Sequence, residues 1–187
     1  VMVMASNPHD LLDQDIVAVI PAYNESRFIG SVVLETRQYC RVVIVVDDGS
    51  TDGTAALAEL AGAQVIRHAG NLGKGAAVNT ALRAAIPYHP AVVVMLDADG
   101  QHSPAELQRV VDPILQGQAD LVIGSRYLAE RTETPRHRVW GHRFFNTIPG
   151  LASGISISDS QSGFRAFSPQ VLERMSFQSQ GFSVESE

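Results

Sequence analysis

The chain has 187 residues, which suits one domain with a proper hydrophobic core. Hydrophobic residues make up 45% of the chain and charged residues 18%, which excludes an intrinsically disordered protein. The net charge of −6 argues against a nucleic-acid partner, the single cysteine excludes an internal disulfide, and no apolar run reaches the roughly 18 residues that a membrane-spanning helix needs.

Continuous apolar runs alternate with amphipathic segments along most of the chain. A short apolar run without polar interruption is typical of a strand buried on both faces. The expected elements are strand 16–20, helix 26–39, strand 42–46, helix 54–61, strand 64–67, helix 76–86, strand 92–96, helix 103–116 and strand 121–124. Pro21 is expected to end the first strand because it has no N–H to donate to a ladder. This alternation predicts an α/β fold with a parallel sheet covered by helices on both faces.

Three segments lie outside this alternation. Residues 1–14 are predicted to be a flexible lead-in, and residues 15–187 to form one domain. Residues 129–143 are basic and rich in turn formers, which predicts an irregular loop that enters a helix near 140–148. The chain stops at Glu187 without a turn or capping signal, so we expect the domain to be truncated there.

Two carboxylates follow the strand over 92–96 with one small residue between them. In extended geometry residues i and i+2 point to the same side, so Asp97 and Asp99 are expected to converge. Two like charges held that close are costly unless a cation or a proton lies between them. The stretch alone leaves two alternatives open, namely a divalent metal site and a pair of solvated loop acids.

Polar loops follow several of the predicted strands at the same edge of the sheet. Open parallel sheets bind their ligands beyond the carboxyl ends of the strands. The loops in question are 21–25, 47–54, 97–102 and 124–127. Their shared edge favours a single clustered site, and it therefore favours the metal alternative for Asp97 and Asp99.

Individual residues of these loops keep two interpretations each. Asp47 and Asp48 either form an Asx turn or cap the next helix, or one of them accepts hydrogen bonds from a nucleobase or ribose. Lys74 follows a glycine loop that matches neither a P-loop nor a dinucleotide turn, yet its position suits an anionic diphosphate. Arg126 is either an ordinary surface charge or, at the functional edge, a partner for a phosphate, which we favour.

Six motifs, taken together and in order, resemble glycosyltransferase family 2. They are PAYNE at 21–25, VDDGSTD at 46–52, NLGKG at 71–75, DADGQH at 97–102, GSRY at 124–127 and DSQSGFR at 159–165. Within that family the set is most similar to polyprenyl-phosphate sugar synthases of the dolichyl-phosphate mannose synthase type. The resemblance implies a GT-A fold, and a metal-dependent inverting transfer of mannose or glucose from GDP-mannose or UDP-glucose to a polyprenyl phosphate.

The resemblance also implies roles for named positions. Together with the loop patterns, it places the nucleotide sugar against Pro21, Tyr23, Glu25, Val46, Asp48, Lys74, Asp97, Ala98 and Asp99. Mg²⁺ or Mn²⁺ is expected on Asp97, Asp99 and Gln101, against the diphosphate. Arg126 and Arg138 are expected to bind the acceptor phosphate, and Asp159 falls where other members carry a catalytic base. The expected location is the cytoplasmic face of a membrane, with peripheral contact.

Three other functions remain open at this point. A family 2 enzyme that acts on a hydroxyl acceptor would need Asp159 as a base. A sugar-nucleotide-forming nucleotidyltransferase would carry a glycine- and arginine-rich loop after its first strand, and residues 21–25 do not form one. A non-catalytic nucleotide-binding module would not need Asp97, Asp99 and Arg126, which are all present.

Overall fold

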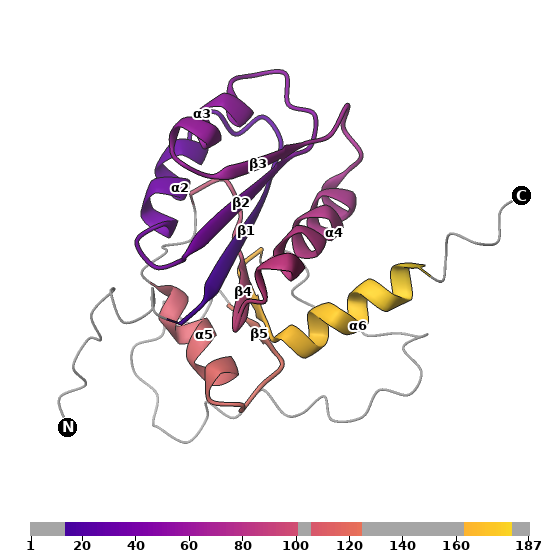
Figure 1. The fold of residues 1–187 in the computed structure, drawn as a ribbon. Coiled ribbons are helices and arrows are strands. Elements are labelled where there is room, and N and C mark those ends of the chain that lie inside the picture. Colours follow the sequence, from indigo (N-terminus) through magenta and orange to yellow (C-terminus); the bar gives the residue numbers. More distant parts are fainter. Residues whose placement is uncertain (1–13, 101–105, 125–162, 181–187) are drawn as a thin grey trace, which may run out of the picture.

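The structure is a computed structural model that describes residues 14–100, 106–124 and 163–180. Within these ranges six strands form one sheet, and helices lie on both sides of it (Figure 1). The strands are β1 (Ile16–Ala22), β2 (Val42–Asp47), β3 (Gln64–Arg67), β4 (Val92–Met95), β5 (Leu121–Ile123) and β6 (Arg165–Phe167). The helices are α2 (Ile29–Thr36), α3 (Thr54–Leu60), α4 (Lys74–Ala85), α5 (Leu107–Leu115) and α6 (Pro169–Gln180), and a 3-10 turn, η1 (Ile86–Tyr88), follows α4.

The sheet has the strand order β3-β2-β1-β4-β6-β5. Strands β1 to β4 pair in parallel, as the alternation of strands and helices predicts, whereas β6 is antiparallel to both β4 and β5. The predicted α/β fold is therefore confirmed, with a sheet that is mostly parallel. Neither β6 nor α6 is predicted from the sequence. The three residues of β6 are too few to establish a run or an alternation.

The strand predicted over residues 121–124 is present as β5, but the prediction that it is buried is wrong. Strand β5 lies at the end of the strand order and pairs only with β6, so one of its edges has no neighbouring strand among the described residues. Leu121 is 44% exposed in consequence. The apolar run is real, but β6 takes the position beside β4 that a buried parallel strand would have occupied.

The prediction that Pro21 ends the first strand is also wrong, because β1 continues to Ala22. Pro21 lies opposite Val46 in the β1–β2 ladder. The carbonyl of Val19 accepts from Leu96 N on the β4 side, and Pro21, two residues on, faces that side too. Pairing with β4 ends at Val19 opposite Met95, so the ladder needs no N–H from Pro21.

The remaining boundaries agree with the expected elements to within a few residues. Helix α4 begins at Lys74 rather than at residue 76, so the glycine loop ends at Gly73. The predicted lead-in up to residue 13, the start of the helix at 103–105, the basic loop over 129–143 and the predicted helix over 140–148 lie outside the described residues.

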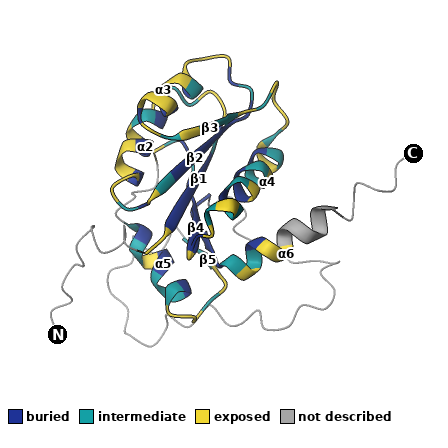
Figure 2. Ribbon diagram, in the orientation of Figure 1, coloured by how far each residue is buried: buried dark blue, intermediate teal, exposed yellow. Residues whose placement is uncertain are grey.

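Apolar side chains fill both faces of the sheet, as the dark blue strands of Figure 2 show. On one face α2, α3 and α5 cover a cluster that includes Ile20, Val33, Val45 and Leu107. On the other face α4 and α6 cover a second cluster, which includes Val19, Val46, Ala81 and Leu172. Burial on both faces is what an uninterrupted apolar strand requires.

The edge formed by the carboxyl ends of β1 and β4 is the topological switch point of the sheet. From β1 the chain moves outward through β2 to β3 and then returns to the other side of β1 as β4. Loops that leave β1 and β4 diverge at this point, and open α/β sheets bind ligands in the crevice between them. The ring of Phe28, after β1, lies within 4 Å of a Cβ placed on Gly100, after β4, so the two loops are in contact distance.

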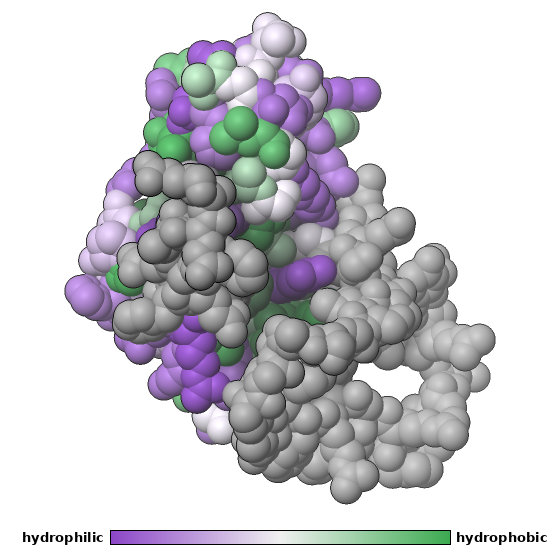
Figure 3. Space-filling view, turned by 90° about the vertical axis from the view of Figure 1, so that its right-hand side faces the viewer, coloured by the Kyte–Doolittle hydropathy of each residue, from purple (hydrophilic) through white to green (hydrophobic). Residues whose placement is uncertain are grey.

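The side of the molecule that lies at the right in Figure 1 is seen face on in Figure 3, where polar and apolar residues are interspersed over the described surface. Helices α4 and α6 belong to this side. Across the described ranges, no helix combines the length and the apolar character that crossing a bilayer would require.

Candidate active site

Hydrogen bonds hold the loop after β1 against the loop after β2, and each loop donates to the other. The backbone N–H groups of Asn24 and Glu25 donate to Ser50 Oγ (2.9 Å) and Thr54 Oγ1 (2.8 Å). In return, Thr51 N donates to Asn24 Oδ1 over 3.0 Å. These bonds fix the backbone on which Tyr23 and Glu25 stand, and the side chain of Tyr23 remains 45% exposed.

Asp47 is fully buried at the end of β2. Its Oδ1 accepts from Ser50 N, three residues on, over 3.0 Å. The side chain thus closes its own loop, as the architectural alternative for this pair anticipated, although the bond is one residue longer than that of an Asx turn. Arg67 Nε lies 3.1 Å from Oδ2, an ion-pair contact without hydrogen-bond geometry. Asp47 therefore shapes its own loop and is not presented to a ligand.

Asp48 is 3% exposed, and its carboxylate accepts three hydrogen bonds from the next segment of the chain. Leu72 N and Gly73 N donate over 3.0 and 2.8 Å, and His68 Nδ1 lies 2.7 Å from Oδ1. Burial alone would raise the pKa of Asp48, but these hydrogen bonds outweigh it and hold the pKa below its usual value. The carboxylate thus fixes the glycine loop, and its predicted contact with the nucleotide stays a prediction.

Asp97 follows β4 and meets two donors that are remote in sequence. Lys74 Nζ, from the first residue of α4, lies 3.0 Å from Oδ1, and Gly163 N donates to Oδ2 over 3.0 Å. The Asp97 side chain is 13% exposed and that of Lys74 is 65% exposed. A Cβ on Gly163 would lie 1.9 Å from Oδ1 of Asp97, so only glycine allows the backbone to approach this closely.

The expectation that extended geometry brings Asp97 and Asp99 together is wrong in its premise. Strand β4 ends at Met95, and Asp99 stands in a turn. Both carboxylates nevertheless act on Glu25: burial first, then the charges of Asp99, Asp52 and Asp97, raise the pKa of Glu25. Negative charge therefore accumulates where the loops after β1 and β4 face each other.

This acidic region suits a divalent cation of the hard, oxygen-binding kind. Mg²⁺ and Mn²⁺ prefer carboxylate and carbonyl oxygens and are usually held by one or two carboxylates together with substrate phosphates. No group of three or more His, Cys, Asp or Glu side chains in the described ranges is arranged to hold a metal ion. Asp97 and Asp99 match the smaller protein donor set of a metal that is shared with a diphosphate.

The other predicted site residues divide into two groups. Pro21 and Val46 stand near the carboxyl ends of β1 and β2, and Ala98 is buried in the turn after β4. The Val46 side chain is fully buried under α4, so it supports the site rather than lining it. Gln101, Arg126, Arg138 and Asp159 lie outside the described residues. Their expected roles stay predictions.

Two contributors to this region were not singled out from the sequence. Gly163 belongs to the DSQSGFR motif, in which the resemblance drew attention to Asp159. The glycine in that motif could have indicated a close backbone approach. His68 is 20 residues from Asp48, and no spacing rule connects them. Only the loop over 70–73, which returns the chain to the end of β2, makes them neighbours.

Comparison with known proteins settles the family. The model of "Glycosyl transferase family 2" matches residues 17–176. The chain belongs to this family. The resemblance, the GT-A fold and the glycosyltransferase class expected from the six motifs are thereby confirmed.

Two family 2 relatives illustrate the similarity. A polyprenol monophosphomannose synthase of Mycolicibacterium smegmatis is 38% identical over 172 residues, which are 87% of this chain and 64% of the relative. A UDP-N-acetylglucosamine–dolichyl-phosphate N-acetylglucosaminyltransferase of Methanococcus voltae is 34% identical, over 90% of this chain and 75% of that protein. The chain thus spans between about two thirds and three quarters of these relatives.

A solved structure supports the same fold. The glucosyl-3-phosphoglycerate synthase of Mycobacterium tuberculosis, in complex with Mn²⁺, UDP-glucose and phosphoglyceric acid, matches with a TM-score of 0.60 and 26% identity. The match covers 89% of this chain and 62% of that one. That structural neighbour therefore holds a divalent metal and a nucleotide sugar together.

Proposed function

We propose that the chain is the catalytic domain of an inverting, metal-dependent glycosyltransferase that moves a hexose from a nucleoside-diphosphate sugar to a polyprenyl phosphate. The observation that carries this proposal is the acidic region between the loops after β1 and β4. There Lys74 Nζ lies 3.0 Å from Asp97 Oδ1, and burial, followed by the charges of Asp99, Asp52 and Asp97, raises the pKa of Glu25. The named activities of two relatives on polyprenol or dolichyl phosphate support the choice of acceptor.

In this proposal Asp97 and Asp99, with Gln101, hold Mg²⁺ or Mn²⁺ against the donor diphosphate. Such a metal acts as a Lewis acid that stabilises the negative charge of the leaving nucleoside diphosphate. Lys74, now 3.0 Å from Asp97, is near enough to share that task from the start of α4. Pro21, Tyr23, Glu25, Val46, Asp48 and Ala98 form or support the surface for the donor, either GDP-mannose or UDP-glucose.

The acceptor side completes the transfer. An oxygen of the acceptor phosphate attacks the anomeric carbon, the bond from that carbon to the diphosphate breaks, and the configuration inverts. A phosphate is already ionised at neutral pH, so Asp159 orients the acceptor or the sugar rather than removing a proton. Arg126 and Arg138 bind the acceptor phosphate. The lipid acceptor places the domain in peripheral contact with the cytoplasmic face of a membrane.

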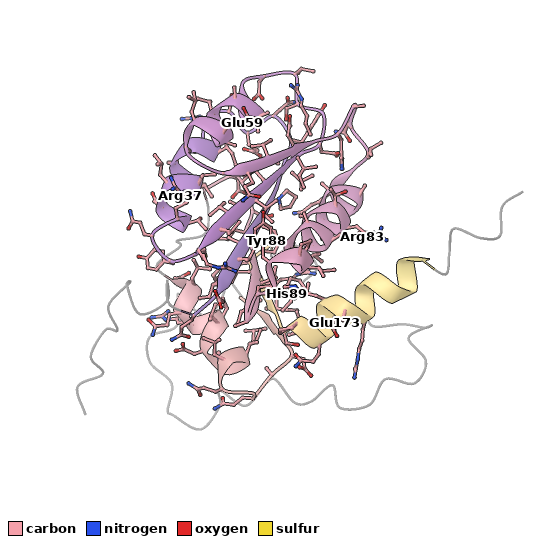
Figure 4. All side chains as sticks on the ribbon, in the orientation of Figure 1. Arg37, Glu59, Arg83, Tyr88, His89 and Glu173 are labelled. Carbon is pink, nitrogen blue, oxygen red and sulfur yellow. The ribbon has the colours of Figure 1, made fainter. Side chains whose placement is uncertain are left out.

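Calorimetry tests the donor side of the proposal. UDP and GDP are titrated into the protein with and without Mn²⁺, and we expect binding of one of them to strengthen when Mn²⁺ is present. Asp97→Asn keeps the shape of the side chain but removes its charge, so the Mn²⁺-dependent part of the affinity should fall at least about tenfold. Glu59→Gln is the matched control, because Glu59 is exposed on α3 (Figure 4). Equal affinities of the Asp97→Asn variant and the wild type would contradict the metal assignment.

Product analysis tests the acceptor side. The protein is incubated with radiolabelled donor and either a polyprenyl phosphate or the corresponding free polyprenol. Label in the organic phase with the phosphate alone supports the proposed acceptor. Transfer to the free alcohol would favour the hydroxyl-acceptor alternative.

A further inference from the structure

His68 connects three separate elements of the fold at one nearly buried point. Its side chain is 11% exposed, and its backbone N donates to the carbonyl of Asp47 over 2.9 Å. Nδ1 lies 2.7 Å from Asp48 Oδ1, at the end of β2, and Nε2 lies 3.0 Å from Thr80 Oγ1, in the middle of α4. Both ring nitrogens therefore have protein partners.

The hydrogen-bond chemistry of this group has a fixed direction. Asp48 accepts two backbone hydrogen bonds and carries its charge, so the His68 Nδ1 facing it must be a donor. In the neutral ring Nε2 is then an acceptor, and the Thr80 hydroxyl donates to it. The order Asp48, His68, Thr80 resembles that of a hydrolase triad. However, Thr80 stands inside α4, where the neighbouring N–H groups are engaged in helical hydrogen bonds and cannot stabilise an oxyanion.

A continuous series of contacts leads from His68 to the acidic region. Asp48, held by His68, accepts from the backbone of Leu72 and Gly73. Gly73 is the residue before α4, has a φ of 93°, and its carbonyl accepts the hydrogen bond from Ala77 N that opens the helix. The next residue is Lys74, whose ammonium lies 3.0 Å from Asp97.

We propose that His68 is a positioning residue for the donor diphosphate: by fixing Asp48 and α4 relative to each other, it holds the loop over 70–73 and sets where Lys74 stands beside Asp97. The inference rests on the proposed function and adds a residue to it. His68 itself touches neither donor nor metal, and it acts through Asp48 and the start of α4.

Three variants and one control test the inference. His68→Ala removes both contacts, His68→Asn keeps an N–H donor near the Nδ1 position, and Thr80→Val removes only the helix contact. His89→Asn is the matched control, because His89 is exposed at the end of η1 and its φ of 47° suits asparagine (Figure 4). Amide hydrogen exchange over residues 70–74 and the calorimetric affinity for UDP and GDP with Mn²⁺ are measured for each.

We expect His68→Ala to accelerate exchange of the Leu72 and Gly73 amides and to weaken nucleotide binding about tenfold, since a hydrogen bond to a charged group is lost. In His68→Asn both the exchange rate and the nucleotide affinity should return most of the way to the wild-type values. Thr80→Val should lie between wild type and His68→Ala, and His89→Asn should change neither quantity. A purely structural role would lower the melting temperature of His68→Ala without a rescue of affinity by asparagine, and that result would overturn the inference.

The two proposals fail in different ways. If the wild type binds no nucleotide while His68→Ala still accelerates exchange in the loop, the proposed function is wrong and the control of the loop by His68 is supported. If the wild type binds nucleotide and all three variants match it in both affinity and exchange, the role of His68 is wrong and the proposed function stands. Should His68→Ala fail to fold, the other two variants still test the inference. Near wild-type exchange and affinity in His68→Asn with intermediate values in Thr80→Val would support the role of His68, and equal values in both variants would contradict it.

Discussion

Strands β2 and β4 both run into aspartates at the same edge of the sheet, yet the two acidic pairs are held differently. Asp47 and Asp48 are 0% and 3% exposed, and the oxygens of Asp48 accept from a histidine and two backbone amides. Asp97 is more open, with a side chain that is 13% exposed, and its charge, after burial and the charges of Asp99 and Asp52, contributes to the raised pKa of Glu25. Donors surround the carboxylate of Asp48, whereas Asp97, which is bonded by Lys74 and Gly163, also acts with Asp99 on the carboxylate of Glu25.

The difference shows that a strand followed by aspartates does not by itself define a ligand site. The two pairs differ in the segment of the chain that packs against each of them. The loop over 70–73 brings backbone N–H groups to the end of β2, so those acids are used to build the loop itself. The end of β4 faces the loop after β1, which supplies Glu25, and charge accumulates there. Functional sites are expected where burial and neighbouring charges perturb the pKa of a carboxylate, as they do for Glu25.

The largest expected effect is a difference in the free energy of unfolding when one aspartate of each pair is replaced by the isosteric asparagine. Asp48→Asn turns an N–H group toward donors that are buried, so we expect a loss of about 2–3 kcal/mol in the free energy of unfolding. Asp97→Asn weakens an ion pair with the exposed Lys74, and we expect a change within about 1 kcal/mol. Urea denaturation measures both.

The contrast between the pairs would be contradicted if Asp97→Asn destabilised the protein as strongly as Asp48→Asn. The acid limb of the stability curve offers a second check. Because the pKa of Asp48 is lowered in the folded state, its contribution is present above the unfolded aspartate pKa and is lost as the pH falls through the folded value. The Asp48→Asn variant should therefore lose less stability on acidification than the wild type.

A smaller but more local effect is expected at Gly163, where the backbone closely approaches the carboxylate of Asp97. Alanine at this position would place its Cβ about 2 Å from the Asp97 carboxylate, so either the start of β6 or Asp97 must move. Overpacking of this kind costs about 1–3 kcal/mol, and we expect Mn²⁺-dependent nucleotide affinity to fall with it. Gly30→Ala is the control: nothing lies within 4 Å of the new Cβ, and an alanine in helix α2 should slightly raise stability.

The Gly163→Ala result bears on the position of β6 as well. If stability fell while nucleotide affinity stayed at the wild-type value, the contact between Gly163 and Asp97 would be a feature of sheet packing alone. Loss of affinity in a variant that remains folded would show that the backbone leading into β6 places Asp97 for its ligand.

The sequence predicts β1, β2 and β4 well because each is an apolar run that must be buried on both faces, and it also locates β3, a short edge strand with polar ends. The same logic locates the site, since Asp97 follows such a run and the carboxyl ends of parallel strands share an edge. It fails at β6, which is too short to show a pattern, and at β5, whose apolar run is equally compatible with an edge. Edge or centre is decided by a strand more than 40 residues away along the chain.

The long-range hydrogen bonds within the site are the features that the sequence predicts least. Asp48 and His68 are 20 residues apart and Asp97 and Gly163 are 66 apart, and neither separation follows a helical or strand period. Such contacts depend on where complete loops return to the sheet. The sequence leaves both alternatives open for Asp47 and Asp48, and the structure favours the architectural one for Asp47 because its carboxylate is fully buried.

The smallest expected effect distinguishes two acids on adjoining loops, Glu25 and Asp52. Hydrogen bonds from Thr54 and Ser26 lower the pKa of Asp52 to about 2, whereas burial and neighbouring carboxylates raise the pKa of Glu25. Thr54→Val should therefore move the pKa of Asp52 back toward its ordinary value. Carboxyl-carbon NMR titration follows both groups in one experiment.

Mg²⁺ adds a condition under which the two acids should respond differently. A cation held by Asp97 and Asp99 neutralises charges that disfavour ionised Glu25, so the pKa of Glu25 should fall when Mg²⁺ and nucleotide are added. The pKa of Asp52 is set first by its bond from Thr54 and should stay near 2. Equal shifts of both acids would mean that Mg²⁺ acts by general screening of the surface, and a Glu25 that does not respond would place the cation away from β4.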